Sequence, residues 1–380
     1  MFRTFLISII GFSLAQISCS SRTRVTGFKA PVETVSNLAE PSPRAMHTAI
    51  WVGDGMLVWG GLLDQTKKIE LSGGSIFYPE TQKWERIPLI QREPISRYHH
   101  SGIRAEDEFI VWGGTDGGLG EPTDSGFRYS LTDKEWRDVS SIDSPTARSG
   151  HTANWDGKHM IIWGGWNGQQ FLADGKYYDP KEDKWHPMPP NDILAGRAYH
   201  TSLIAGDKLL IWGGLNETGV LDTGAVFDMK TKAWSPIVTE GAPQSRMGHS
   251  AVWTGDSMII WGGSDNIDRY FRNGYSYDPE SKTWTRLSKK QSPPARESHS
   301  SVWTGKEMII WGGSRRNINF RYGAAYNPES DSWRPIRTQQ RNFGRKHHSA
   351  VWTGEKMIIW GGKNGEKFIE AGENYSLTVD

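Results

Sequence analysis

The sequence has almost no cysteine and almost no net charge, and each scarcity excludes a class of protein. Cys19 is the only cysteine, so disulfides cannot hold the folded region together. The 44 basic and 43 acidic residues give a net charge of +1, without the basic excess of a nucleic-acid-binding protein. Hydrophobic residues make up 36% of the chain, too few for a protein with several membrane spans. We therefore expect no nucleic-acid partner.

Sequence patterns that mark common catalytic sites are also missing. The chain contains no nucleophile elbow, no phosphate-binding loop and no zinc-binding signature. The sequence therefore predicts no catalytic residue, no metal ligand and no cofactor.

The N-terminus is typical of an exported protein. Arg3 precedes an apolar run from Phe5 to Ala15, which has the length of a signal-peptide core and is too short to span a membrane. The segment that ends at Cys19 resembles a bacterial lipobox, although Gln16 stands where Leu is usual. This resemblance implies a signal peptide over 1–19, lipidation of Cys19, and a membrane-anchored lipoprotein, periplasmic or on the cell surface. The alternative is ordinary secretion, with Cys19 lost in the cleaved peptide. Residues 20–30 are polar and basic and predict a flexible tether.

The rest of the chain repeats with a period near fifty residues. Seven Trp-Gly-Gly triplets recur at steps of 53, 51, 49, 49, 50 and 49 residues. The glycine pairs are Gly60-Gly61, Gly113-Gly114, Gly164-Gly165, Gly213-Gly214, Gly262-Gly263, Gly312-Gly313 and Gly361-Gly362. This period predicts a radial repeat with one β-sheet per copy.

One copy, from Arg246 onward, shows the expected sheet. Residues 249–253 alternate as an inner strand, and 258–261 form a continuous apolar run, typical of a strand buried on both faces. Strands at 275–277 and 283–287 follow, separated by Asp278-Pro279. Each copy is therefore predicted to form four antiparallel strands.

These motifs resemble the kelch repeat. The double glycine is followed about a dozen residues later by an aromatic residue and then, six or seven residues on, by a tryptophan. The resemblance covers nearly all of residues 32–380 and implies an all-β, seven-bladed kelch-type β-propeller over 31–380. The seventh copy stops after three strands. In five of the six complete copies the fourth-strand tryptophan lies 12 residues before the next arginine. The same count back from Arg44 gives Val32, so we expect 32–35 to close the last blade.

A second constant pattern, Arg-x-x-His, occurs once in each copy. It is found at Arg44/His47, Arg97/His100, Arg148/His151, Arg197/His200, Arg246/His249, Arg296/His299 and Arg345/His348. Because a ligand site seldom needs seven equal copies, we expect a structural role, with the histidine hydrogen-bonded between blades and the arginine fixing the loop. Metal ligation or general-base catalysis by the histidines is the alternative, and arginines that line the channel mouth and attract anions are another.

The loops between the second and third strands carry the candidate binding residues. Eighteen of the 19 tryptophans occupy repeat positions and are expected in the core, and only Trp166 lies outside the pattern. In kelch-like propellers these loops share one face, which commonly holds ligands. The acidic residues on this face are Asp116, Glu121, Asp124, Asp174, Glu217 and Asp222, and the basic ones are Arg315, Arg316 and Arg321.

This distribution predicts an acidic side and an opposite basic side. Ordinary solvated charge is one explanation, and complementarity to a polar or charged partner is the other. The candidate ligand-binding residues are Trp166, Arg315, Arg316, Arg321, Asp116, Glu121 and Asp124. Packing of Trp166 on the adjoining loop is the alternative to a binding role.

The resemblance and the missing motifs favour a non-catalytic binding or scaffold protein for a protein or glycan partner. The alternative is a carbohydrate-active enzyme similar to the kelch-type sialic acid mutarotases. Oxidase chemistry that needs a Tyr–Cys crosslink is excluded, because Cys19 lies outside the propeller. The acid and histidine set of an iron-dependent specifier-type lyase is not visible in the sequence.

Overall fold

Short antiparallel strands make up the fold, in the order that the repeat predicts. The computed structural model describes residues 39–62, 73–89, 97–117, 120–336, 343–369 and 375–378, all within the compact unit Ala39–Asp380. Their strands pair into six four-stranded sheets, one three-stranded sheet and four two-stranded sheets. The described chain is an all-β propeller with six complete blades. No described helix is both long enough and apolar enough to span a membrane.

Each blade is one four-stranded sheet. Blade 1 consists of β1 (Thr48–Trp51), β2 (Met56–Trp59), β3 (Gly74–Tyr78) and β4 (Lys83–Arg86). Blade 2 consists of β6 (Ser101–Ala105), β7 (Glu108–Trp112), β9 (Gly126–Ser130) and β10 (Trp136–Asp138). Blade 3 consists of β11 (Thr152–Trp155), β12 (Met160–Trp163), β13 (Gly175–Asp179) and β14 (Lys184–Pro187).

The next three blades repeat this arrangement. Blade 4 consists of β15 (Thr201–Ala205), β16 (Lys208–Trp212), β19 (Gly224–Asp228) and β20 (Ala233–Pro236). Blade 5 consists of β21 (Met247–Trp253), β22 (Met258–Ser264), β23 (Gly274–Asp278) and β24 (Thr283–Arg286). Blade 6 consists of β25 (Ser300–Trp303), β26 (Met308–Trp311), β29 (Gly323–Asn327) and β30 (Ser332–Ile336).

The remaining strands form the three-stranded sheet and the small pairs. The three-stranded sheet consists of β31 (Ser349–Trp352), β32 (Lys356–Trp360) and β35 (Tyr375–Thr378). The two-stranded sheets are β5 (Arg97–Tyr98) with β8 (Thr115–Asp116), β17 (Leu215–Asn216) with β18 (Gly219–Val220), β27 (Ser314–Arg315) with β28 (Ile318–Asn319), and β33 (Lys363–Asn364) with β34 (Lys367–Phe368).

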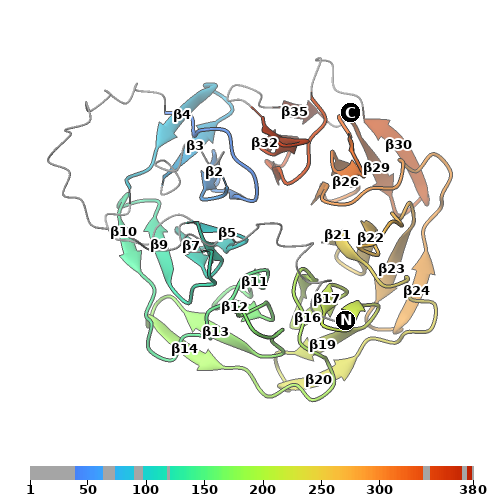
Figure 1. The fold of residues 1–380 in the computed structure, drawn as a ribbon, viewed down its shortest axis with the longest axis horizontal. Coiled ribbons are helices and arrows are strands. Elements are labelled where there is room, and N and C mark those ends of the chain that lie inside the picture. Colours follow the sequence, from blue (N-terminus) through green and yellow to red (C-terminus); the bar gives the residue numbers. More distant parts are fainter. Residues whose placement is uncertain are drawn as a thin grey trace, which may run out of the picture. The chain divides into compact units, whose positions relative to one another are not determined.

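The first strands of the sheets lie side by side around a ring. Within 39–380 they contact one another in the order β1, β6, β11, β15, β21, β25 and β31, and β31 contacts β1 again (Figure 1). The predicted count of seven blades is not confirmed, because the sheet that contains β31 has three strands. The segment 32–35, predicted to complete it, lies outside the described residues, as do the predicted signal peptide and tether.

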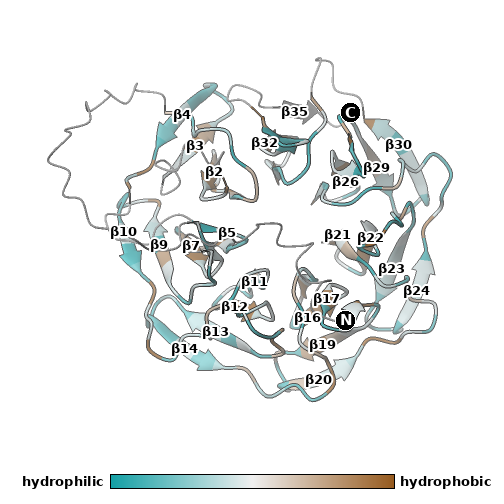
Figure 2. Ribbon diagram, viewed as in Figure 1, coloured by the Kyte–Doolittle hydropathy of each residue, from teal (hydrophilic) through white to brown (hydrophobic). Residues whose placement is uncertain are grey.

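The strands of blade 5 confirm the four strands predicted for the copy that begins at Arg246. All four predicted strands are present, and β22 runs three residues further than predicted, through the glycine pair to Ser264. The four core positions of each second strand, such as Met258 to Trp261, are fully buried. Figure 2 shows the same contrast, with brown inner strands such as β2 and β7 and teal outer strands such as β10 and β14.

The glycine pair is required by close packing at the end of each second strand. Gly262 and Gly263 have φ of +72° and +89°, a left-handed conformation that disfavours a side chain. A Cβ on Gly262 would lie 2.8 Å from the His299 ring, and one on Gly263 would lie 2.6 Å from the Met247 carbonyl oxygen. Gly262 therefore allows the next blade to approach, and Gly263 allows close approach of the first strand of its own blade.

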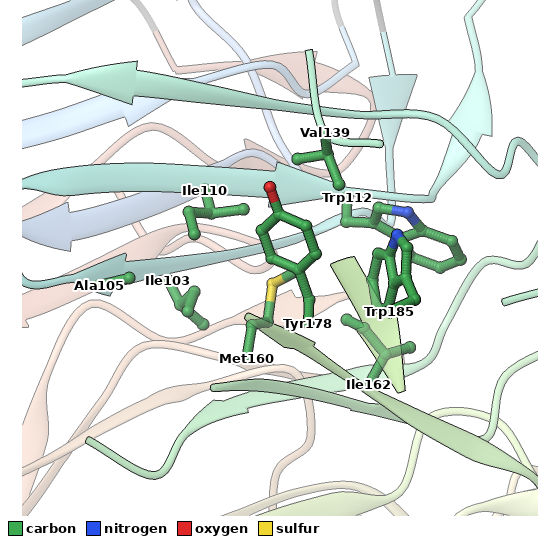
Figure 3. Close-up of a cluster of buried hydrophobic side chains, with 9 residues drawn as sticks. All are labelled: Ile103, Ala105, Ile110, Trp112, Val139, Met160, Ile162, Tyr178 and Trp185. Atoms are coloured by element: carbon green, nitrogen blue, oxygen red, sulfur yellow. The ribbon is translucent and has the colours of Figure 1, made fainter. Parts of the chain in front are cut away.

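The apolar core lies between neighbouring blades. Between blades 2 and 3, the side chains of Ile110 and Trp112 face those of Ile162, Tyr178 and Trp185 (Figure 3). The tryptophans before the glycine pairs are at most 2% exposed, which confirms their predicted core role.

Most fourth-strand tryptophans also bind the preceding blade through the indole N–H. Each of five donates to a backbone carbonyl there at 2.8–3.2 Å, and the pairs are Trp136 with Pro88, Trp185 with Ser140, Trp234 with Pro189, Trp284 with Val238 and Trp333 with Ser288. Each blade therefore depends on its predecessor through hydrogen bonds as well as apolar contacts.

Candidate functional site

The repeated arginines hold the glycine pairs in place. In all seven copies Nη1 donates to the carbonyl of the first glycine, 16 residues later, at 2.7–3.2 Å. These arginines are at most 2% exposed. The predicted role in fixing the loop is confirmed. The alternative, that they line a channel mouth and attract anions, is wrong because their guanidinium groups are buried inside the blades.

The repeated histidines join neighbouring blades. In six copies Nε2 lies 2.6–3.0 Å from a Ser or Thr hydroxyl on the first strand of the preceding sheet. In all seven, the ring meets the tryptophan before the preceding glycine pair edge to face, at 5.0–5.3 Å between centroids. The predicted structural role is confirmed, and the catalytic and metal-binding alternatives are not needed.

Burial keeps these histidines neutral. Desolvation, with the adjacent Arg296 as a second cause, lowers the pKa of His299 to about 3. The same two causes lower the pKa of His151 and His249 to about 3. A ring that stays neutral and hydrogen-bonded between blades cannot serve as a base for a ligand at the surface.

The residues between Arg and His form a feature that the sequence analysis missed. The second residue after each arginine has φ between 52° and 64°. We call these residues the inner ring: Met46, His99, Gly150, Tyr199, Gly248, Ser298 and His347. Five backbone N–H groups of this ring donate to the counterpart carbonyl in the preceding sheet, at 2.9–3.4 Å. The sequence does contain a sign of this ring, because the residue before each repeated histidine varies between copies while the arginine and histidine stay constant.

The inner ring lies at the same end of the sheets as the loops between second and third strands. Arg97 and Tyr98, just before His99, pair with Asp116 and Thr115, just after the glycine pair. Ser149 pairs in the same way with Trp166. We call this end the loop face. The variable residues of the motif and the variable loops therefore occupy one face of the propeller.

Aromatic and histidine side chains gather on part of the inner ring. The His99 ring lies 5.2 Å from Tyr98 and 5.3 Å from Tyr199, and the Tyr199 hydroxyl is 3.4 Å from His99 Nδ1. Burial lowers the pKa of His99 to about 4 and raises that of Tyr199 to about 12. Burial, with Lys346 and His99 as smaller causes, lowers the pKa of His347, on the same ring, to about 3. The cluster is neutral and suited to apolar and hydrogen-bonding contacts.

Trp166 is half-buried and packs within its own loop. Its ring lies 4.8 Å from that of Phe171, and its backbone pairs with Ser149 at 2.9 Å in both directions. The contact with Phe171 supports the packing alternative, and the half-buried indole keeps part of its surface open to solvent. The loop also lies beside blade 2, because a Cβ on Gly168 would be 3.6 Å from Glu121 Oε2. The structure thus brings Glu121 close to the Trp166 loop.

The predicted acidic side is weaker than its sequence suggests. Asp116 is only 7% exposed, and its charge partly offsets the lowering of the Arg97 pKa by burial, to about 10. Asp174 forms an ion pair with the buried Arg148 at 3.0 Å. Both carboxylates therefore stabilise repeat arginines, although the Asp174 side chain stays 54% exposed. Glu121, Asp124, Glu217 and Asp222 are exposed as well.

The predicted basic side lies on blade 6. Arg315 belongs to β27, Arg316 follows it in the turn, and Arg321 lies beyond β28, and all three are exposed. Trp166 belongs to blade 3, three first strands away around the ring. The structure therefore brings Trp166 and the arginines to one face but not into contact. Among the described residues, no group of three or more His, Cys, Asp or Glu side chains could hold a metal ion.

Known proteins match this chain through the repeat. A family model described as the KLHDC2/KLHL20/DRC7 Kelch-repeats domain matches residues 46–241 and 199–378. Tip elongation aberrant protein 1 of Schizosaccharomyces pombe is 27% identical over 154 residues, which cover 37% of this chain and 13% of that protein. Ras guanine nucleotide exchange factor F of Dictyostelium discoideum is 26% identical over 140 residues, 36% of this chain and 12% of that protein. The leucine-zipper-like transcriptional regulator 1 homolog of Drosophila melanogaster is 26% identical over 137 residues, which cover 34% of this chain and 14% of that protein. These three relatives are eukaryotic, and the match spans only a small part of each.

Proposed function

Because this chain belongs to the Kelch-repeat domain family, we propose that it is a non-catalytic binding protein whose loop face recognises another protein. One observation carries the proposal. The constant residues of the repeat are buried and bonded to one another, whereas the variable residues gather on one face. A fold that uses its repeated chemistry internally leaves the variable positions for recognition.

Several features support a protein partner. Tyr98, Tyr199 and Trp166 offer aromatic surface with polar groups at its edge, a composition enriched at protein interfaces. Of the relatives, Ras guanine nucleotide exchange factor F is named for Ras, which is itself a protein. A glycan partner is the alternative, because an indole ring can also stack on sugars.

A matched set of full-length variants tests this proposal. The wild type would be probed with a phage-displayed library of random 12-residue peptides and with a glycan array. We expect Trp166→Ala and Tyr199→Ala to weaken the strongest ligands found. Lys306→Ala is the control, because the turn after β25 lies at the opposite end of the sheet. Equal binding by all variants would place recognition elsewhere, and accelerated conversion of a bound sugar to its other anomer would favour the mutarotase-like enzyme instead.

The proposal includes closure of the ring by the N-terminus. The three-stranded sheet is the place of a seventh blade, since its first strand contacts β25 on one side and β1 on the other. His47 also binds Ser349 of this sheet at 2.6 Å and meets Trp360 at 5.0 Å. The spacing of the fourth-strand tryptophans supports residues 32–35 as the strand that completes it.

The proposal also includes export and a lipid anchor at Cys19, on a bacterial membrane. Its support is the sequence of residues 1–19, in which the apolar run from Phe5 to Ala15 is followed by the only cysteine, Cys19. An anchored propeller with a polar tether would meet its partner outside the cytoplasm.

A further inference from the structure

The hairpin formed by β27 and β28 departs from the repeat at its first turn position. In blades 3, 4 and 5 the second residue after the glycine pair is Asn167, Asn216 or Asp265. Each uses its side-chain oxygen to accept backbone N–H groups of the following turn, at 2.8–3.2 Å. Arg315 stands at this position in blade 6. A guanidinium cannot accept a hydrogen bond, so the turn of blade 6 lacks the hydrogen bonds from its backbone N–H groups to a side-chain oxygen at this position.

The next residue has a backbone conformation that its residue type disfavours. Arg316 has φ of +53°, a left-handed conformation that is unfavourable for a residue with a long side chain. The equivalent hairpin of β33 and β34 has the same two-residue turn, and Gly365 occupies this position with φ of +59°. Two successive residues thus oppose the local fold, and both place an exposed positive charge on the loop face. Such departures from local preference are expected at functional sites.

Exposed apolar side chains accompany the two arginines. Ile318 is 61% exposed and is the cross-strand partner of Arg315, so the two side chains lie on one face of the hairpin. Phe343 is 56% exposed and Tyr322 is 38% exposed. Phe343 lies beside the end of the hairpin, since a Cβ on the next residue would be 1.9 Å from the Asn319 oxygen.

The hairpin is held firmly at its base. Ser314 and Glu297 exchange two backbone hydrogen bonds of 2.9 and 3.0 Å. Asn319 Nδ2 donates to Asn364 Oδ1 of the neighbouring hairpin at 3.0 Å. The arginines therefore project from a fixed platform, which lowers the entropy lost when a ligand binds.

We propose that this hairpin is a docking site for an acidic protein segment, with carboxylates bound by Arg315 and Arg316 and an apolar side chain packed on Ile318. The site rests on the proposed function, whose partner chemistry it specifies. Planar guanidinium groups bind carboxylates through paired hydrogen bonds. The charge of this loop is uniformly positive over 314–322, so it is complementary to an acidic segment.

The test uses a variant that restores the repeat's own turn residues. Arg315→Asn with Arg316→Gly is expected to fold at least as stably as the wild type, which separates binding from folding. The full-length proteins are compared by selection from the same phage-displayed 12-residue library, and selected peptides are then synthesised for titration. We expect the wild type to enrich peptides rich in Asp and Glu with an apolar residue, and the variant to bind them at least about ten-fold more weakly. Lys306→Ser, a charge removed from the opposite end of blade 6, should leave their affinity unchanged.

Three other outcomes contradict the docking site. Enriched peptides without acidic residues, or acidic peptides that the variant binds equally well, overturn it while leaving a protein-binding function in place if Trp166→Ala weakens them. Failure to enrich any peptide overturns both proposals. Wild-type binding to phosphatidylserine vesicles that the variant loses, without acidic peptides, assigns the hairpin to a membrane surface instead.

Discussion

Acidification should unfold the propeller, because the repeated histidines are buried in their neutral form. Burial is the largest cause that lowers the pKa of His47, His151, His249 and His299 from 6.5 to about 3. In the unfolded chain these rings return to a pKa of about 6.5. Below pH 6.5 the unfolded chain therefore binds more protons than the folded chain. The free energy of unfolding is fully present above this pH and falls as the pH is lowered towards 3.

The size of the effect follows from the shift. A histidine whose pKa drops from 6.5 to about 3 on folding costs about 2 kcal/mol of stability at pH 5. The four histidines together cost about 8 kcal/mol by the same reasoning. His100, His200 and His348, whose pKa values are also far below the usual range, act in the same direction. Since folded proteins are stable by about 5–15 kcal/mol, we expect acid unfolding with a midpoint between about pH 5 and 6.

Urea unfolding followed by tryptophan fluorescence at several pH values between 7.5 and 5 measures this directly. His299→Gln keeps an amide that can donate to Ser250, and it should lower the proton uptake on unfolding at pH 5 by one. His186 is exposed on β14, so His186→Gln is the control. It should leave the dependence of the free energy of unfolding on pH as it is in the wild type. A free energy of unfolding that is equal at pH 7.5 and 5.5 would refute the reasoning. So would a His299→Gln variant whose free energy of unfolding depends on pH as strongly as that of the wild type.

Four other changes test separate parts of the account. Arg246→Met should cost about 3–5 kcal/mol of stability, because buried carbonyls that accept from the guanidinium lose their donor; a loss under about 1 kcal/mol in urea unfolding would contradict this. Trp166→Ala should weaken peptide binding by about 1–3 kcal/mol in calorimetry, whereas a lower melting temperature with unchanged affinity would reduce its role to packing on Phe171. Cys19→Ser should move the protein from the membrane to the soluble extracellular or periplasmic fraction, and a wild type that is already soluble would end the lipid-anchor proposal. Deletion of residues 1–36 should lower the melting temperature by exposing a sheet edge, and an unchanged value would contradict closure by 32–35.

Most of the fold could be predicted because the repeat states its structural rules seven times. The buried second strands, the four-strand order of blade 5 and the roles of Arg246 and His249 all follow from positions that stay constant between copies. The predictions about the N-terminus had no such repetition to support them. Residues 1–38 occur once, and they lie outside the described part of the chain.

The candidate site was harder to predict because its positions are defined by backbone geometry and not by residue type. Met46, Tyr199 and His347 adopt left-handed conformations that these residues do not favour on their own, so nothing in their chemistry announces the inner ring. Asp116 was predicted to be on the surface, but pairing of its strand with Arg97 buries it. A carboxylate that stabilises a buried arginine and one that faces a ligand look alike in a sequence.

The inner ring separates what the propeller binds from what makes it fold. Its links are made by main-chain amides and carbonyls, which every residue except proline can supply in the same way. The side chains at the five non-glycine positions can therefore change, among residues that tolerate a left-handed backbone, while the links between sheets stay intact. Mutations to such residues would alter partner choice at little cost in stability, and related chains could diverge in recognition faster than in architecture.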